Sequence, residues 1–359
     1  MPLQRQVAFW FAALAVLVAL LWLLSDILLP FVAGMGLAYL LDPVASRAQR
    51  LGVGRPISAL VIVIVFVLVL VIVGMLVAPV LTSQVAAFLD DLPGYLSRLQ
   101  SIISDPSRPW LARVFGGRLP EGGESAGGLV AQGSGWIATF LASVWSGGRA
   151  LFSVLSLLII TPIVAFYLLC DWNRVVTTVD RWIPLQHRDT VRGLAREIDH
   201  AIAGFVRGQA VVCLALAVFY AVALTLTGLN FGFLIGLMSG FLGFIPYFGA
   251  LTGFLVATVV AIAQFWPEWS AILLVVGVFL VGQVLEGYVL SPKLVGAKVG
   301  LHPVWLMFAL IAFGYLFGFV GLLIAIPVAA AIGVLLRFGV RKYMASPLYT
   351  GQSSNQGPH

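Results

Sequence analysis

Hydrophobic residues along this chain occur in long runs, not in the short alternating segments that are typical of a soluble domain. Several of these runs are close to the roughly 20 residues that an α-helix needs to cross the hydrocarbon of a bilayer. The clearest runs lie at residues 7–24, 57–78, 150–170, 210–226 and 271–290. We therefore expect an all-α, polytopic integral membrane protein.

A shorter run at residues 27–41 is expected to be a thin or broken span. It is interrupted by residues that weaken a helix, namely Pro30, Gly34 and Gly36. No small-residue cleavage site separates it from the run before it, so residues 7–24 are expected to remain as the first membrane helix. Asp42 stands directly before Pro43, which favours a helix stop over a ligand at this position.

Basic residues predict the orientation of these spans, because loops rich in lysine and arginine stay in the cytoplasm. Three arginines follow the run at 27–41, namely Arg47, Arg50 and Arg55. More arginines follow residue 170, namely Arg174, Arg181, Arg188, Arg192, Arg196 and Arg207. Both stretches and both termini are therefore expected to be cytoplasmic, and residues 79–149 are expected to lie outside the cell.

Extramembrane segments complete the predicted organisation. Residues 79–149 begin with an apolar stripe at helical spacing, made of Val85, Phe88, Leu92, Tyr95, Leu99 and Ile102. Residues 116–135 are rich in glycine and predict a flexible loop. A second stripe predicts a cytoplasmic helix near 187–207. The chain is accordingly divided into N-terminal membrane helices (1–78), an extramembrane insertion (79–149), a main membrane domain (150–344) and a disordered tail (345–359).

Two further apolar runs, residues 232–263 and 304–336, are each about 33 residues long and contain glycine and proline. A continuous helix of that length would reach about 50 Å, whereas the hydrocarbon of a bilayer is about 30 Å thick. Each run is therefore too long for one simple helix and too short for two crossings. We expect either a tilted, broken span or a re-entrant hairpin. The hairpin would keep Lys293 and Lys298 in the cytoplasm, so the positive-inside rule favours it.

Composition agrees with a membrane protein, since 61% of the 359 residues are hydrophobic and 9% are charged, against about 25% charged residues in soluble domains. The net charge of +6 comes from loops between apolar runs, which disfavours nucleic-acid binding. Cys170 and Cys213 lie inside apolar runs, so we expect them to pack and predict no metal site. No nucleophile elbow, phosphate loop or dinucleotide fingerprint occurs. We therefore predict no enzyme, no catalytic residues and no cofactor.

Paired, interrupted segments on either side of one simple helix are what internally repeated transporters use to build a solute site near the membrane midplane. In the first segment Pro246 removes a backbone donor, Tyr247 adds an amphipathic ring and Gly249 permits a turn or a close approach. Gly318 marks the break in the second segment. The alternative is that these residues only kink packed helices. We predict that the segments around Pro246 and Gly318 line the solute path or move.

Glu286 lies one turn before the end of the apolar run at 271–290, and Gln283 precedes it on the same helix face. A carboxylate at this depth is costly in lipid, so it should face protein, water or a solute. Two interpretations stay open. Glu286 is an interfacial carboxylate that pairs with Lys293 or Lys298, or it couples or gates transport. The substrate or coupling site is thus predicted to include Glu286 and Gln283.

Several blocks of the sequence resemble one known family. They read LLPFVAGMGLAYLLDPVASRAQRLGVGR, TPIVAFYLLCDW, FVRGQ, GLMSGFLGFIPYFGALTG and EGYVLSPKLVGAKVGLHPVWLMFALIAFGYLFGFVGLLIAIPVAA. Through these blocks the chain resembles, nearly end to end, the autoinducer-2 exporter family of PerM-type permease-like proteins. The resemblance implies an inner-membrane protein with about eight membrane segments, homo-oligomeric assembly, and export of small solutes such as the quorum-sensing signal autoinducer-2.

Three functions remain in competition. The first is a secondary transporter that exports a small solute, with a proton or sodium as a possible coupling ion. The second is an antiporter of sodium or another monovalent cation against protons, which other members of the family resemble. The third is a membrane scaffold or regulatory protein that recruits partners through residues 79–149, although the glycine-rich half of that segment argues against a rigid binding surface.

Overall fold

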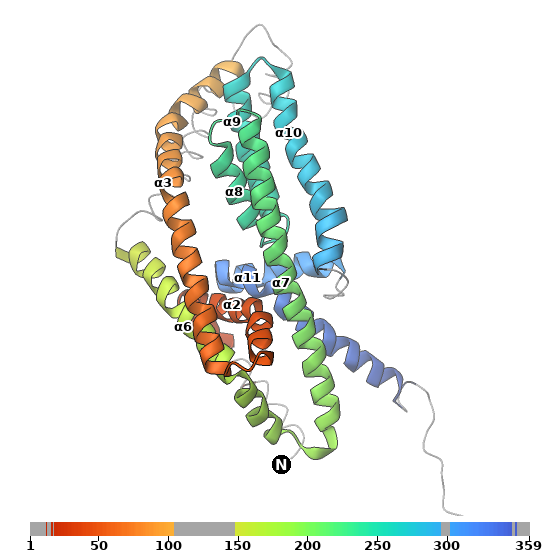
Figure 1. Ribbon diagram of the computed structural model, residues 1–359. Helices are drawn as coiled ribbons and strands as arrows, with labels where there is room; N and C mark the ends of the chain where they lie inside the picture. Colours follow the sequence, from red (N-terminus) through yellow and green to blue (C-terminus); the bar gives the residue numbers. More distant parts are fainter. Residues whose placement is uncertain are drawn as a thin grey trace, which may run out of the picture. The chain divides into compact units, whose positions relative to one another are not determined.

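The computed structural model describes residues 18–103, 148–295 and 302–346, together with residues 12, 16 and 349. Every regular element in this described part is a helix (Figure 1). Seven of its helices are long and apolar enough to cross a bilayer, and one further apolar helix is shorter. The predicted all-α, polytopic fold is therefore confirmed. Half of the predicted first span, most of the predicted tail and all of the predicted glycine-rich loop lie outside the described residues.

The described helices lie in three stretches of the chain, residues 25–103, 148–295 and 303–344. In chain order they are α2 (Ser25–Arg50), α3 (Arg55–Ile103), α6 (Gly148–Trp182), the 3₁₀ helix η1 (Leu185–His187), α7 (Arg188–Leu226), α8 (Gly232–Leu242), α9 (Phe248–Phe265), α10 (Trp269–Val284), the π-helix η2 (Leu285–Val295) and α11 (Pro303–Met344).

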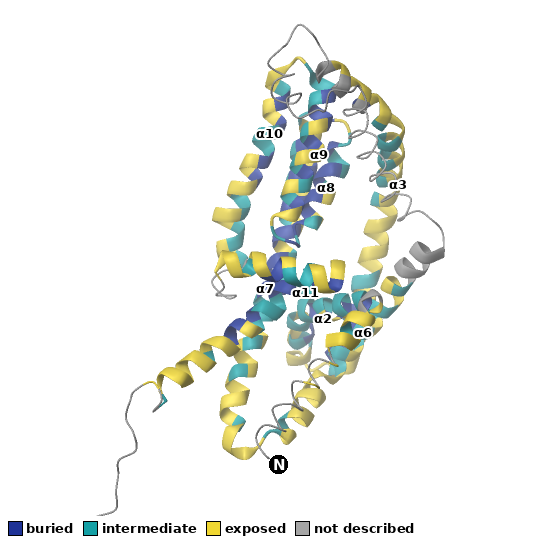
Figure 2. Ribbon diagram, turned by 180° about the vertical axis from the view of Figure 1, so that it is seen from behind, coloured by how far each residue is buried: buried dark blue, intermediate teal, exposed yellow. Residues whose placement is uncertain are grey.

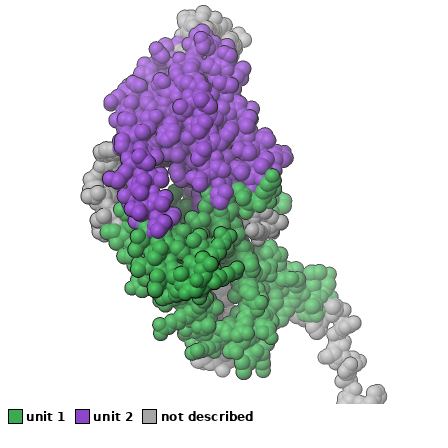
Figure 3. Space-filling model, in the orientation of Figure 1, with its two compact units in different colours: residues 1–64, 157–210, 292–359 green, residues 65–156, 211–291 purple. Residues whose placement is uncertain are grey.

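The chain forms two compact units, each assembled from separate stretches of sequence (Figure 3). Unit 1 comprises Met1–Ile64, Leu157–Ala210 and Pro292–His359, and unit 2 comprises Val65–Ser156 and Val211–Ser291. α3, α6 and α7 each contribute one end to each unit. The division into segments that the sequence suggests follows where the chain enters and leaves the membrane, whereas these two units are defined by packing. The predicted division therefore stays a prediction.

Helix α2 runs without interruption through the prolines inside it, so the predictions of a thin or broken span and of a helix stop at Asp42 were wrong. The neighbouring helix α6 explains why the helix persists. Gly34 lets α6 approach, since a Cβ on Gly34 would lie 2.7 Å from Val164. On the same helix the Thr161 hydroxyl donates to the Pro30 carbonyl at 3.2 Å. Tertiary contacts thus override the local preference for a break.

Two helices, α3 and α7, each join two segments that the sequence predicts separately. α3 joins the predicted span at 57–78 to the amphipathic stripe that follows it. α7 joins the predicted cytoplasmic helix near 187–207 to the span at 210–226. A change from polar to apolar surroundings does not end a helix, and the isolated Gly208 in α7 costs only about 1 kcal/mol. Such long helices are therefore physically reasonable even where polarity changes.

The first part of the stripe on α3, up to Tyr95, faces the interior of unit 2, as its spacing predicts. Tyr95 is buried, and the rings of Phe88 and Tyr95 contact Phe231 edge to face, with centroids 5.3 and 6.4 Å away. The Tyr95 hydroxyl also accepts a hydrogen bond from Asn230 Nδ2 at 3.0 Å. These contacts surround Phe231, whose φ of 59° is uncommon for a residue with a side chain. The stripe therefore supports the turn that starts α8.

Glycines bring the second half of α7 into direct contact with α8 and α10 in unit 2. A Cβ on Gly236 of α8 would collide with the backbone at Tyr220, and a Cβ on Gly240 would collide with Ala217. A Cβ on Gly282 of α10 would collide with the Tyr220 ring. Glycines at four-residue spacing thus form the close helix contact that such spacing permits. Figure 2 shows buried residues concentrated along α7 and α8.

The first of the two long apolar runs is a hairpin of α8 and α9. Near the turn, a Cβ on Gly249 would collide with the backbone at Gly243. At the open end, Gln264 Oε1 accepts a hydrogen bond from the Asn230 amide at 2.8 Å, and its Nε2 donates to the Gly228 carbonyl at 2.9 Å. Both ends of the hairpin therefore lie together. The predicted break is confirmed, and it takes the form of a hairpin.

The second long run reverses at Gly318, inside α11. Gly318 has φ 57° and ψ −137°, a conformation that is open almost only to glycine. After this point Leu322 lies against Gly314, and Gly321 lies against the Phe313 carbonyl. Residues eight apart on a straight helix are about 12 Å from each other, so a straight helix could not make these contacts. The predicted break at Gly318 is confirmed.

Gly318→Ala should destabilise the protein by about 1–3 kcal/mol, because alanine in this backbone conformation is strained even though the new Cβ would meet no atom within 4 Å. Gly339→Ala is the matched control. Gly339 also lies in α11 with open space around it, but its backbone is helical, so alanine should stabilise by about 0.5–1 kcal/mol. Thermal unfolding in detergent measures both variants. Equal melting temperatures would contradict the reversal at Gly318.

Candidate functional site

The predicted break around Pro246 is the turn of the α8–α9 hairpin, residues 243–247, which we call the hairpin tip. The amides of Phe244 and Ile245 each donate to a carbonyl three residues back at 3.1 Å. Pro246 has no amide hydrogen, and Tyr247 follows with φ 67° and a side chain that is 55% exposed. These bonds, with those from the Gly243 amide, occupy the last carbonyls of α8, whereas the first amides of α9 lack partners within their own helix. The hairpin tip therefore offers backbone groups to a polar solute.

Gly249 and Gly253 allow the hairpin tip to be this tight. Both lie on the side of α9 that faces α8, where a Cβ on Gly249 would meet the backbone of Gly243 and Leu242. A Cβ on Gly253 would meet the side chain of Ser239, which is buried. The predicted role of Gly249 in close approach is thus visible in the packing, and its role in binding a solute stays a prediction.

Gln283 and Glu286 lie together, as their spacing predicts. The Gln283 amide nitrogen donates to the Glu286 carboxylate at 3.3 Å. Gln283 is near the end of α10, and Glu286, which is partly buried, is in the first turn of η2. π-helical turns are rare and occur often at functional sites. Within the described residues no lysine or arginine pairs with Glu286, and Lys298 lies outside them.

The hairpin tip and Glu286 reach a similar depth in the bundle formed by α8, α9, α10 and the second half of α7. α8 and α10 both begin at the open end of the hairpin and run away from it. On α8, Gly240 contacts Ala217 three residues before the hairpin tip. On α10, Gly282 contacts Tyr220, one turn from Ala217 and four residues before Glu286. Backbone breaks and a carboxylate thus lie at the same end of one bundle.

Tyr220 is a polar residue of this bundle that the sequence analysis did not single out. Its side chain is 1% exposed and its ring stacks on Phe279, with centroids 4.9 Å apart. The hydroxyl packs against Gly282 and faces the Gln283 side chain without a hydrogen bond of ordinary geometry. A buried hydroxyl without a partner is costly. The sequence feature that could have pointed to this residue is a tyrosine in the middle of the apolar run at 210–226.

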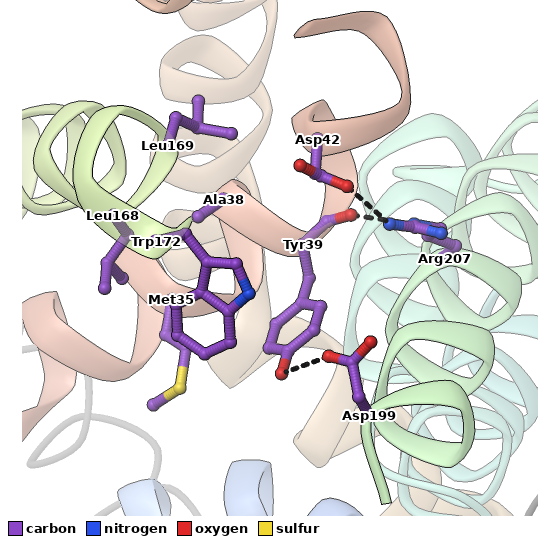
Figure 4. A pocket seen from close by; sticks show the side chains of 9 residues that line it. All are labelled: Met35, Ala38, Tyr39, Asp42, Leu168, Leu169, Trp172, Asp199 and Arg207. Atoms are coloured by element: carbon purple, nitrogen blue, oxygen red, sulfur yellow. Dashed lines mark hydrogen bonds and ion pairs between the residues drawn. The ribbon is translucent and has the colours of Figure 1, made fainter. Parts of the chain in front are cut away.

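Unit 1 contains a second polar site that the sequence analysis missed, a pocket of about 70 Å³ that we call the Asp42 pocket (Figure 4). α2, α6 and α7 supply its lining. The lining residues are Met35, Ala38, Tyr39, Asp42, Leu168, Leu169, Trp172, Asp199 and Arg207.

Asp42 connects three helices in this unit. Arg55 of α3 and Arg207 of α7 approach its carboxylate, with N–O distances of 3.1 and 3.5 Å. Arg207 Nε also donates to the Tyr39 carbonyl at 2.8 Å. Pro43 explains this bond, because a proline has no amide hydrogen to give to the carbonyl four residues before it. The proline that the sequence analysis took as a stop signal therefore frees a carbonyl for Arg207.

The residues of the predicted site are divided between the two units. Gln283, Glu286, Pro246, Tyr247 and Gly249 belong to unit 2, where the bundle brings the hairpin tip and the Gln283–Glu286 pair to one end. Gly318 belongs to unit 1 and forms the reversal of α11. The Asp42 pocket could not be found from local sequence, since Tyr39 and Arg207 are 168 residues apart.

A chain with seven candidate spans among its described helices, a helical hairpin and a carboxylate at one end of an apolar bundle has the features of polytopic membrane transporters. A family model described as AI-2E family transporter matches residues 11–341, and the chain belongs to this family. The resemblance found in the sequence is thereby confirmed.

Three relatives carry names that agree with a transporter. The chain is 28% identical over 320 residues to YrrI of Bacillus subtilis, which is named as a transport protein, with 88% of this chain and 87% of that protein covered. It is 28% identical over 332 residues to PerM of Escherichia coli, which is named as a permease, with 90% and 92% covered. It is 26% identical over 350 residues to a Mycobacterium tuberculosis protein named as a transport protein, with 93% and 92% covered.

Proposed function

We propose that this chain is a secondary transporter that exports a small polar solute, with autoinducer-2 as the first solute to test, across the bacterial inner membrane. The observation that supports the proposal is that the hairpin tip and Glu286 lie at the same end of one bundle in unit 2. A coupled carrier needs a place for its solute and a group that exchanges its coupling ion. Broken helices and intramembrane carboxylates supply these two parts in membrane transporters.

In this proposal the hairpin tip binds the solute. A small polar solute needs hydrogen-bond donors and acceptors close to it, because it loses its hydration shell when it enters the bundle. The amides at the start of α9 and the exposed Tyr247 side chain offer such groups. α8 has 11 residues and rises about 16 Å, so the hairpin tip would lie roughly halfway through a hydrocarbon layer of about 30 Å.

Glu286 would supply the coupling. A carboxylate in apolar surroundings is far less costly when it is protonated, so loading with a proton favours a closed, dry bundle and release favours an open, wet one. The hydrogen bond from Gln283 holds the carboxylate in place. Entry of a proton down its gradient would then accompany exit of the solute.

The proposal includes the orientation of the chain. Arginines and a lysine in the last turns of α2 and α11 support cytoplasmic placement of both termini, namely Arg47, Arg50, Arg341 and Lys342. The family resemblance supports a homo-oligomer.

Everted membrane vesicles that contain this protein should take up labelled autoinducer-2 faster than vesicles without it, and a protonophore should abolish the difference. Everted vesicles expose the cytoplasmic face, so export appears as uptake. Uptake that survives the protonophore would keep the exporter and remove proton coupling. If uptake equals that of empty vesicles, autoinducer-2 is not the solute, and sodium-dependent proton flux in the same vesicles would then favour the antiporter.

A further inference from the structure

One carboxylate of the Asp42 pocket has no cationic partner. Asp42 is shared by Arg55 and Arg207. Asp199, on α7, accepts a hydrogen bond from the Tyr39 hydroxyl at 3.1 Å, and among the residues that the structure describes no arginine or lysine pairs with it. Both guanidiniums near the pocket, those of Arg55 and Arg207, lie against Asp42, so the negative charge that is not balanced locally is that of Asp199. The pocket is therefore suited to a cation.

Aromatic rings form the wall beside this carboxylate. Tyr39 and Trp172 meet edge to face, with ring centroids 6.3 Å apart and planes at 65°. Figure 4 shows Tyr39 between Trp172 and Asp199. The faces of such rings carry partial negative charge and attract cations within about 6 Å. Two rings at a wide angle make a corner that a rounded cation can touch on two sides.

The size and chemistry of the pocket select the kind of cation. Its volume is about 70 Å³. A cavity that holds one water molecule has about 10–15 Å³ by the same measure, so this pocket has room for a group of about five heavy atoms. Its remaining walls are apolar, with Met35, Leu168 and Leu169 among them. A metal ion such as Ca²⁺ would need about six to eight oxygen ligands, whereas this lining has two carboxylates, one of which is already held by two arginines.

We propose that the Asp42 pocket binds a small alkylammonium group, with Asp199 as counter-ion and Trp172 and Tyr39 as its aromatic walls. This site lies in unit 1 and does not depend on the solute or the coupling proposed for unit 2. The ammonium group can belong to a free solute or to the headgroup of a lipid such as phosphatidylethanolamine, since the chemistry is the same. Neither source needs the protein to transport anything.

Equilibrium binding of labelled tetramethylammonium to the purified full-length protein tests the site. Asp199→Asn should weaken binding at least tenfold while keeping an oxygen that accepts from the Tyr39 hydroxyl, so the fold should be retained. Trp172→Phe should weaken binding by a factor of about three to ten, through loss of the better cation–π partner. Asp189→Asn is the matched control, because Asp189 is an exposed aspartate on the same helix outside the pocket.

The outcomes separate the alternatives. The proposal is overturned if wild-type protein shows no saturable binding, or if Asp199→Asn binds as wild type does. Comparing nanodiscs of phosphatidylglycerol alone with nanodiscs that also contain phosphatidylethanolamine then identifies the source. Competition by the second lipid supports a headgroup site, and equal binding in both supports a free solute. Autoinducer-2 uptake is measured separately, so failure of this proposal is distinguishable from failure of the proposed transport function.

Discussion

Gly240→Leu should cost the protein about 3 kcal/mol or more of folding free energy. A Cβ at position 240 would collide with the backbone and side chain of Ala217 on α7. Backbone atoms cannot move aside as the end of a flexible side chain can, so α8 and α7 would have to separate. Separation would open gaps along a contact that has no room for water, and dispersion contacts would be lost on both helices. The hairpin would then lose its support.

Gly277→Leu is the matched control for this packing prediction. Gly277 also lies inside an apolar helix, α10, but a Cβ there would meet no atom within 4 Å. Leucine has a higher helix propensity than glycine by roughly 0.5–1 kcal/mol, so this variant should be as stable as wild type or slightly more stable. Size-exclusion elution after heating in detergent measures both. A wild-type melting temperature for Gly240→Leu would show that α8 does not pack on α7 in this way.

Much of the fold could be predicted because it depends on local pattern. The length of the apolar runs predicted the helices, and glycine with proline predicted the breaks at the hairpin tip and at Gly318, which are reversals in the structure. Glycines at positions 236 and 240 form a close helix contact in the structure, and the sequence could not name α7 as the partner. These features depend on residues within a few turns of one another, where spacing alone determines which atoms meet.

The unbroken course of α2 could not be predicted in the same way. Pro43 disrupts a helix when its neighbourhood is ignored. Here Arg207 satisfies the carbonyl of Tyr39 that the proline leaves without a donor, and Arg55 with Arg207 balances the charge of Asp42. The compensation comes from helices far away in the sequence. The sequence around Asp42 and Pro43 therefore reads the same whether the helix stops there or continues with support from distant helices.

The candidate site in unit 2 was predictable in part for a similar reason. The three-residue spacing of Gln283 and Glu286 predicted their contact, and the structure places them at 3.3 Å. Tyr220 was missed because its position in an apolar run is typical of a packed ring. Only the contact with Gly282 brings its hydroxyl to the Gln283 side chain. The sequence alone cannot separate a tyrosine that only packs from one that faces a candidate site residue.

Glu286→Gln should reduce protonophore-sensitive uptake by at least tenfold in the everted-vesicle assay and leave the folded protein intact. Glutamine has nearly the shape of glutamic acid and still accepts a hydrogen bond from Gln283, but it cannot exchange a proton. A group that stays neutral would keep the bundle in its dry form. Glu268→Gln is the control, since Glu268 is exposed at the start of α10 and its side chain makes no capping hydrogen bond. Its uptake should match wild type.

Tyr220→Phe sharpens this test, because function and stability should respond with opposite signs. Removing a buried hydroxyl that lacks a partner should leave the folding free energy unchanged or improve it by up to about 1–3 kcal/mol, so the melting temperature should stay the same or rise. The ring keeps its stack on Phe279. If the hydroxyl forms hydrogen bonds with Gln283 or Glu286 while the proton is bound and released, uptake should nevertheless fall severalfold. Wild-type uptake in both Glu286→Gln and Tyr220→Phe would remove this end of the bundle from the coupling mechanism and leave the hairpin tip as a site for solute alone.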